Sequence, residues 1–114
     1  MKITPQALVV QTPRERAALS RLRQLLNEPG LLRASLIHSS RRCGKSYCRC
    51  AKAKRYRHFS WYIGHSRKGR PHMKYLPEEL VGEVRAWVTR YREAHKLLDK
   101  VSYVYWERLK RYRS

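Results

Sequence analysis

The middle of this chain lacks acidic residues. From residue 29 to residue 77 there is no Asp or Glu, whereas the same segment contains thirteen of the 27 Lys and Arg residues. The formal net charge of the 114-residue chain is +19, so most of the surplus lies in this segment. Because a solvated surface normally mixes both signs, a segment of one sign is typical of a face that binds a polyanion, above all nucleic acid.

Cysteine is scarce, and long apolar runs are lacking. The three cysteines are an odd number, so we do not expect a disulfide framework. No apolar run approaches the roughly 20 residues that cross a membrane, and the first residues lack the cleavage pattern of a signal peptide. We therefore expect a cytoplasmic protein without membrane contacts. The 42% hydrophobic content excludes a disordered basic tail.

The length suits one small domain, residues 1–114, of class α+β. Residues 1–30 should contain the N-terminal helix, which begins after a short lead and ends at residues 27–30. Thr12 can cap it, Pro13 suits its first position and Glu15 completes a capping box. A short strand at residues 7–10 precedes this helix in our interpretation.

Residues 31–76 should form a small, basic, cysteine-rich antiparallel sheet. Alternating side chains predict strands at 31–40, 58–64 and 70–76, with a turn at 65–69. Because proline cannot donate to a strand ladder, Pro71 indicates either that the last strand lies at an edge or that it starts after the proline.

Residues 77–114 should form a long C-terminal helix, from Pro77 to about Tyr112. At a rise of about 1.5 Å per residue it spans roughly 50 Å, and the N-terminal helix, at roughly 24 Å, is too short to cover it. The second half, residues 94–112, should therefore self-associate or dock on a larger protein, unless the helix breaks near Asp99. Its apolar residues repeat in steps of four and three, which is typical of a coiled coil: Leu80, Val84, Trp87, Tyr91, Ala94, Leu98, Val101 and Tyr105.

All three cysteines lie within residues 43–50, here called the cysteine segment. Three thiolates and one imidazole suit tetrahedral zinc, and two cysteines separated by one residue can point to the same side of an extended turn. We therefore predict a zinc site, which would compensate for a small core. The predicted ligands are Cys43, Cys48, Cys50 and His58, with His38, His65 and His72 as alternatives for the fourth place. The competing interpretation is three reduced thiols in a basic loop.

Basic side chains and tyrosines alternate around the cysteine segment. A sheet with Arg and Lys on its face can enter a major groove, and exposed tyrosines, Tyr62 among them, can stack on unpaired bases. The predicted contact residues are Arg41, Arg42, Lys45, Arg49, Lys52, Lys54, Arg55, Arg57, Arg67, Lys68, Arg70, Lys74, Tyr47 and Tyr56.

The same segment argues against catalysis. A metal nuclease needs carboxylates beside its ions, and residues 29–77 have none. A Cys–His nucleophile would lack a nearby acid to orient the histidine. We therefore expect no enzymatic activity.

Three motifs carry a resemblance to a known family. CGKSYCRCA at residues 43–51, HFSWYI at residues 58–63 and YLPEELV at residues 75–81 resemble a family of small uncharacterised prokaryotic proteins. The resemblance covers about residues 31–100. Members often have Gly-Pro after the histidine, where this chain has Phe59 and Ser60. The family brings no activity to transfer, but its frequent association with mobile elements agrees with nucleic-acid work.

Together these features predict a non-enzymatic protein that contacts phosphates through a basic, zinc-bound sheet. DNA is slightly favoured over RNA, and the protein would be an accessory factor of a mobile element or a ribonucleoprotein. The alternative is an interaction adaptor that docks through its long aromatic helix.

Overall fold

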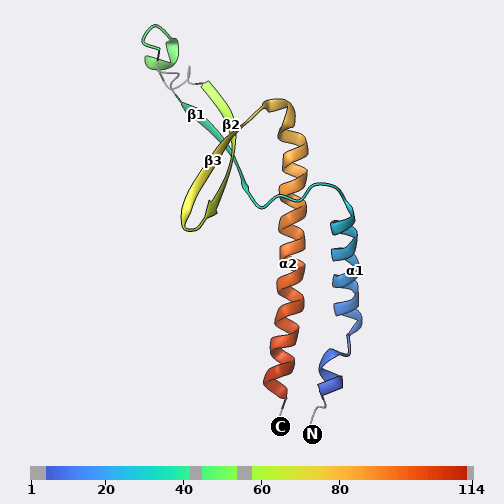
Figure 1. Ribbon diagram of the computed structural model, residues 1–114. Helices are drawn as coiled ribbons and strands as arrows, with labels where there is room; N and C mark the ends of the chain where they lie inside the picture. The colour runs from blue at the N-terminus through green and yellow to red at the C-terminus, as the bar shows by residue number, and fades with distance from the viewer. Residues whose placement is uncertain (1–4, 42–44, 54–57, 113–114) are drawn as a thin grey trace. The chain divides into compact units, whose positions relative to one another are not determined.

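The computed structural model describes residues 5–41, 45–53 and 58–112. It confirms the predicted α+β fold, with an N-terminal helix, a three-stranded antiparallel sheet and a long C-terminal helix (Figure 1). The elements in order are η1 (Pro5–Val9), α1 (Pro13–Asn27), β1 (Ser35–Arg41), η2 (Arg49–Ala51), β2 (His58–Arg67), β3 (Arg70–Leu76), η4 (Glu78–Leu80) and α2 (Val81–Arg111).

The chain divides into two units, each with a core of its own. One unit comprises residues 1–31 and 89–114, and the other comprises residues 32–88. That the whole chain forms one domain stays a prediction. In the part of the chain that the structure describes, no helix is long and apolar enough to cross a membrane.

Helix α1 begins where the capping signals predict. Thr12 Oγ1 accepts a hydrogen bond from the Glu15 N–H at 3.1 Å, and Pro13 takes the first helical position. The cap satisfies a backbone donor that has no partner inside the helix. After the helix ends at Asn27, Gly30 has a φ of 92°, a conformation that glycine adopts without steric cost.

The strand predicted at residues 7–10 is wrong, because Pro5–Val9 form the 3-10 helix η1. A strand needs a neighbour for its backbone groups, and the described sheet contains only β1, β2 and β3. Pro5 also suits the start of a helical turn, where its missing N–H is not required.

In the first unit α1 packs along α2. Leu22, Leu25 and Ala94 are buried together. At the surface Arg21 donates to both carboxylate oxygens of Glu93, at 3.1 and 3.2 Å. Helix α2 is continuous through Asp99, so the alternative of a break there is wrong.

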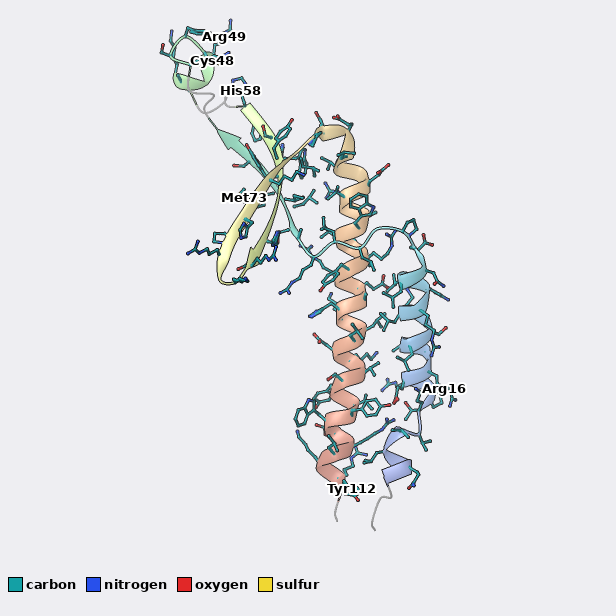
Figure 2. All side chains as sticks on the ribbon, viewed as in Figure 1. Arg16, Cys48, Arg49, His58, Met73 and Tyr112 are labelled. Carbon is teal, nitrogen blue, oxygen red and sulfur yellow. The ribbon has the colours of Figure 1, made fainter. Side chains whose placement is uncertain are left out.

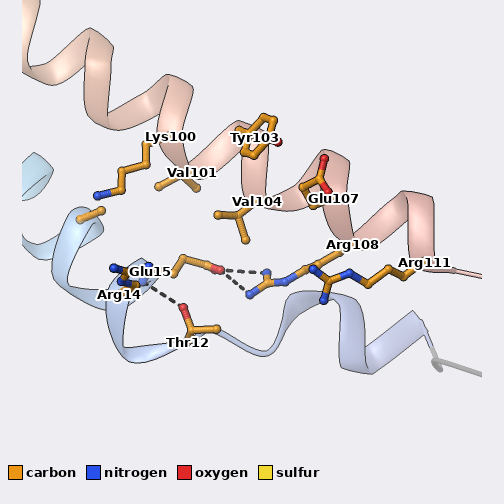
Figure 3. A pocket seen from close by; sticks show the side chains of 11 residues that line it. Thr12, Arg14, Glu15, Lys100, Val101, Tyr103, Val104, Glu107, Arg108 and Arg111 are labelled. Carbon is orange, nitrogen blue, oxygen red and sulfur yellow. Dashed lines mark hydrogen bonds and ion pairs between the residues drawn. The ribbon is translucent and has the colours of Figure 1, made fainter.

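A buried ion pair joins the start of α1 to the end of α2 (Figure 3). The Glu15 side chain is fully buried, and its Oε1 lies 2.7 Å from Arg108 Nη2 in an ion pair rather than an aligned hydrogen bond. Arg108 Nη1 donates to Glu15 Oε2 at 3.3 Å and to the Leu8 carbonyl at 3.1 Å. The hydrogen bond to Glu15 raises the pKa of Arg108, which therefore stays charged.

The predicted heptad pattern of α2 holds only in part. Val84 and Ala94 are buried, but Leu80 and Leu98 are 41% and 52% exposed. A straight helix has about 3.6 residues per turn, so a strict seven-residue repeat drifts around it by about 20° per repeat. Partly buried Leu97, next to Leu98, accordingly packs in the core with α1.

The sheet has the order β1-β2-β3, and its register gives each face a distinct character. Trp61 lies opposite both His38 and Leu76. On this face Leu36, Trp61, Ile63 and Leu76 pack against Val81, Val84 and Val88 of α2 and form the core of the second unit. Strand β3 pairs only with β2, which confirms the edge position predicted from Pro71.

The predicted strand bounds need two corrections. Strand β1 begins at Ser35 rather than at residue 31. Strand β2 continues to Arg67, because its pairing with β3 extends to the Arg67–Arg70 pair. The turn is therefore only Lys68 and Gly69, with φ values of 53° and 74°, as in the two-residue turns that match the twist of a hairpin.

The ion pair predicts an order of stability for the wild type and two variants. Arg108→Leu should lower Tm by several degrees, because it leaves the buried Glu15 carboxylate without its cation. Glu15→Leu combined with Arg108→Leu should melt closer to wild type, since the buried charge is gone as well. Thermal unfolding followed by circular dichroism measures both. A double variant less stable than Arg108→Leu would contradict this account.

Candidate nucleic-acid interface

The hairpin tip, residues 67–70, concentrates positive charge. Arg67 and Arg70 are direct cross-strand partners, and Lys68 lies in the turn between them. All three side chains are exposed. Like charges directly opposite each other destabilise a hairpin, whereas a phosphate placed between them would turn this repulsion into attraction. The tip is therefore suited to bind an anion.

The two cations of β3 and the histidine between them share a sheet face with the core, nearer the turn. By strand alternation, Lys74, His72 and Arg70 lie on the same face as Leu76. The rings of His65 and His72 stack across the strands, with centroids 5.4 Å apart. The basic sheet face expected from the sequence is thus present at the turn end only, because the middle of that face, with Trp61 and Leu76, packs against α2.

The described part of the cysteine segment and its continuation, residues 45–53, form a tight turn. The N–H of Cys48 donates to Lys45 O at 3.2 Å, and the N–H of Ala51 donates to Cys48 O at 3.0 Å. Arg49–Ala51 form the 3-10 helix η2 rather than the extended turn expected for Cys48 and Cys50. Backbone hydrogen bonds within the turn account for the difference, since an extended chain cannot make them.

Cys48 and His58 meet across this region (Figure 2). Cys48 Sγ lies 3.2 Å from His58 Nε2. Two ligands of a tetrahedral zinc ion, at about 2.3 Å for sulfur and about 2.0 Å for nitrogen, would be about 3.5 Å apart. The pair therefore has nearly the separation that zinc requires, and a thiol–imidazole hydrogen bond is the other arrangement that fits this distance.

The remaining histidines lie in other surroundings. His38 stacks on Trp61 with ring centroids 4.4 Å apart, and His65 pairs with His72. Of the histidines that the sequence offers as fourth ligand, His58 is the one shown beside Cys48. Within the described residues no three His, Cys, Asp or Glu side chains cluster as a metal site.

Several predicted site residues lie outside the described residues. Lys45, Tyr47, Arg49 and Lys52 are described and exposed, and Lys45 Nζ is 5.9 Å from the centre of the Tyr47 ring. The predicted positions outside the described residues are Arg42, Cys43, Lys54, Arg55, Tyr56 and Arg57, together with the side chains of Arg41 and Cys50.

On the second face of the sheet the sequence interpretation named only Tyr62, which is half-buried rather than exposed. Tyr62 and Tyr75 are cross-strand partners there, with rings edge to face and centroids 6.1 Å apart. Met73 and Tyr75 are 59% and 57% exposed, and neither was predicted to belong to a site. The signal was the register: once Trp61 is in the core opposite Leu76, Tyr62 and Tyr75 must point away from it.

A basic pocket in the first unit was also missed (Figure 3). It has a volume of about 310 Å³, and Arg14, Lys100 and Arg111 contribute to its lining. Its two carboxylates already have cations: Glu15 pairs with Arg108, and a hydrogen bond from Lys110 lowers the pKa of Glu107. The sequence could not locate it, because the lining comes from α1 and from a distant part of α2.

The fold and these surfaces define a small α+β protein with a cationic β-hairpin. Residues 12–86 match the family described as "Domain of unknown function (DUF6788)", and the chain belongs to this family. Searches of curated proteins and of solved structures find no significant match.

Repulsion at the hairpin tip yields a stability prediction. Arg70→Glu should raise the free energy of unfolding by about 0.2–1 kcal/mol at low salt, because an attractive cross-strand pair replaces a repulsive one. Lys74→Glu is the matched control, since Lys74 lies opposite uncharged Ile63. Urea unfolding measures both, and in about 1 M salt the gain should shrink as screening increases. Equal changes in the two variants would refute tip repulsion.

Proposed function

We propose that the protein binds nucleic acid without catalysing a reaction, with the hairpin tip contacting phosphates. The observation that carries the proposal is the exposed Arg67–Arg70 pair, with Lys68 between them, inside a 49-residue segment without a carboxylate. Each cation placed on a phosphate releases counterions, which makes affinity strong and dependent on salt.

The hairpin is the element that would enter the nucleic acid. A two-stranded ribbon fits the major groove of DNA, which is about 12 Å wide, and the cations of the cysteine segment, beyond the other end of β2, would add phosphate contacts of their own. DNA is the slightly favoured target, and RNA in a ribonucleoprotein is the next. A role as accessory factor of a mobile element agrees with either.

We further infer that zinc holds the cysteine segment against the start of β2. The ligands would be Cys43, Cys48, Cys50 and His58, and the Cys48–His58 separation of 3.2 Å supports two of them. The ion would be structural: four protein ligands leave no open position for a substrate.

Metal analysis tests the site. Protein purified without chelator should contain one zinc per chain, and both Cys48→Ser and His58→Ala should lower that content and the thermal stability of the protein. Lys45→Ala, in the same turn, is the control and should retain the metal. Metal-free wild-type protein with full stability would show that the thiols are only reduced side chains.

An interaction adaptor is the second candidate. Four large apolar residues of α2 are more than half exposed: Leu98, Tyr103, Trp106 and Leu109. Such a group of exposed apolar side chains is unusual for a protein that functions as a monomer. These residues fall within 94–112, where self-association or docking on a larger protein was expected.

The salt dependence of binding tests the proposed function. With a DNA duplex, log K should fall linearly with log salt, and Arg67→Gln with Arg70→Gln should reduce the slope by about two, one for each phosphate that is no longer neutralised. Arg92→Gln with Lys96→Gln, at two exposed positions of α2, is the charge-matched control and should leave the slope unchanged. If neither DNA nor RNA binds wild-type protein at physiological salt, the adaptor function is favoured instead.

A further inference from the structure

The sheet has a second face, opposite the one that packs on α2. We call it the tyrosine face, because its large side chains are apolar or aromatic and include two tyrosines. Register and strand alternation place Ile37, Tyr62, Met73 and Tyr75 together on it. Around them the same face carries only small or uncharged residues: Ser35, Ser39, Ser60, Gly64, Ser66 and Pro71.

Gly64 lies at the centre of the tyrosine face and lets the apolar side chains on either side of it come together. A Cβ at this position would lie 3.2 Å from Ile37 Cδ1 and 3.6 Å from Met73 Cγ. The absence of a side chain therefore lets Ile37 and Met73 approach each other across β2. Beside them Tyr75 stands edge to face with Tyr62 and remains 57% exposed.

Charge lies at the ends of this face and not on it. None of the described side chains on this face is Lys, Arg, Asp or Glu. At one end the chain continues into residues 42–57, which contain seven Lys and Arg residues, and at the other end lies the turn with Lys68. No carboxylate occurs anywhere in residues 29–77. Apolar rings between two groups of cations are complementary to a strand whose bases lie flat and whose phosphates extend beyond them.

We propose that the tyrosine face stacks unpaired bases, so that the protein binds single-stranded nucleic acid in addition to the duplex that the hairpin tip contacts. The inference rests on the proposed function and adds a second target to it. Stacking on tyrosine is possible for every base, because every base has a π-face. In a duplex the bases are covered by their neighbours, and taking one out of the stack costs energy. The acid-free surroundings favour this polyanion over a neutral peptide.

The dimensions of the face suggest a short binding site. Tyr62 and Ser66, the last residue of β2 on this face, are four residues apart, which is about 14 Å at a strand rise of about 3.4 Å. Stacked nucleotides are spaced at about 3.4 Å per strand. The distance from the tyrosine pair to the turn end of this face therefore corresponds to roughly four nucleotides, at the lower end of the range of known single-strand sites.

The test uses the full-length protein and three labelled probes: oligo(dT) and oligo(rU) of about twelve nucleotides, and a blunt DNA duplex. Tyr75→Ala should weaken binding of both single strands at least about fivefold, the equivalent of about 1 kcal/mol for one stacked base, and leave duplex binding unchanged. Tyr75→Phe should restore wild-type affinity, because the ring is retained. Tyr103→Ala, another exposed tyrosine, is the control.

The outcomes separate the inference from the proposed function. If Tyr75→Ala binds single strands as wild type does, or loses single strands and duplex equally, the tyrosine face is not a base-stacking site. The proposed function survives that result if the Arg67→Gln and Arg70→Gln double variant still weakens binding. If no probe binds wild-type protein, both are wrong. The two single-strand probes also show whether the face distinguishes DNA from RNA.

Discussion

Burial of one face of the sheet against the start of α2 is the constraint on which the rest of the second unit depends. Three short strands are stable only when one face is covered, and here Trp61 and Leu76 meet Val84 and Val88. Because side chains alternate along a strand, this packing also decides which residues stay outside. It leaves Tyr75 on the tyrosine face, and it confines the basic residues of the hairpin to the part of the sheet outside the core.

The distribution of charge follows from the same constraint. Lys and Arg cannot replace the buried residues of so small a core without losing hydration. Ten of the thirteen cations of residues 29–77 accordingly lie in the hairpin tip or in residues 42–57, between β1 and β2. Self-repulsion among them opposes folding, most directly where Arg67 faces Arg70. A polyanion would remove that repulsion, and zinc would add folding free energy to the same unit. Both proposals therefore address one instability.

The sequence predicted well the features that depend on neighbouring residues. It predicted less well the features that depend on pairing and packing between distant parts of the chain. The Thr12 cap and the edge position of Pro71 depend on neighbouring residues, and both are confirmed. The length of the turn and the partners of Leu98 depend on pairing and packing across the chain, which no local pattern contains. The tyrosine face was missed for the same reason, since it exists only once the register of β2 and β3 is known.

The central claim is that the sheet and its hairpin form the nucleic-acid interface. The most direct test is an NMR titration of the ¹⁵N-labelled protein with oligo(dT), followed amide by amide. The account predicts that chemical-shift changes concentrate in β2, the turn at Lys68–Gly69 and β3. Changes confined to residues 94–112 of the long helix, or no changes at all, would contradict it.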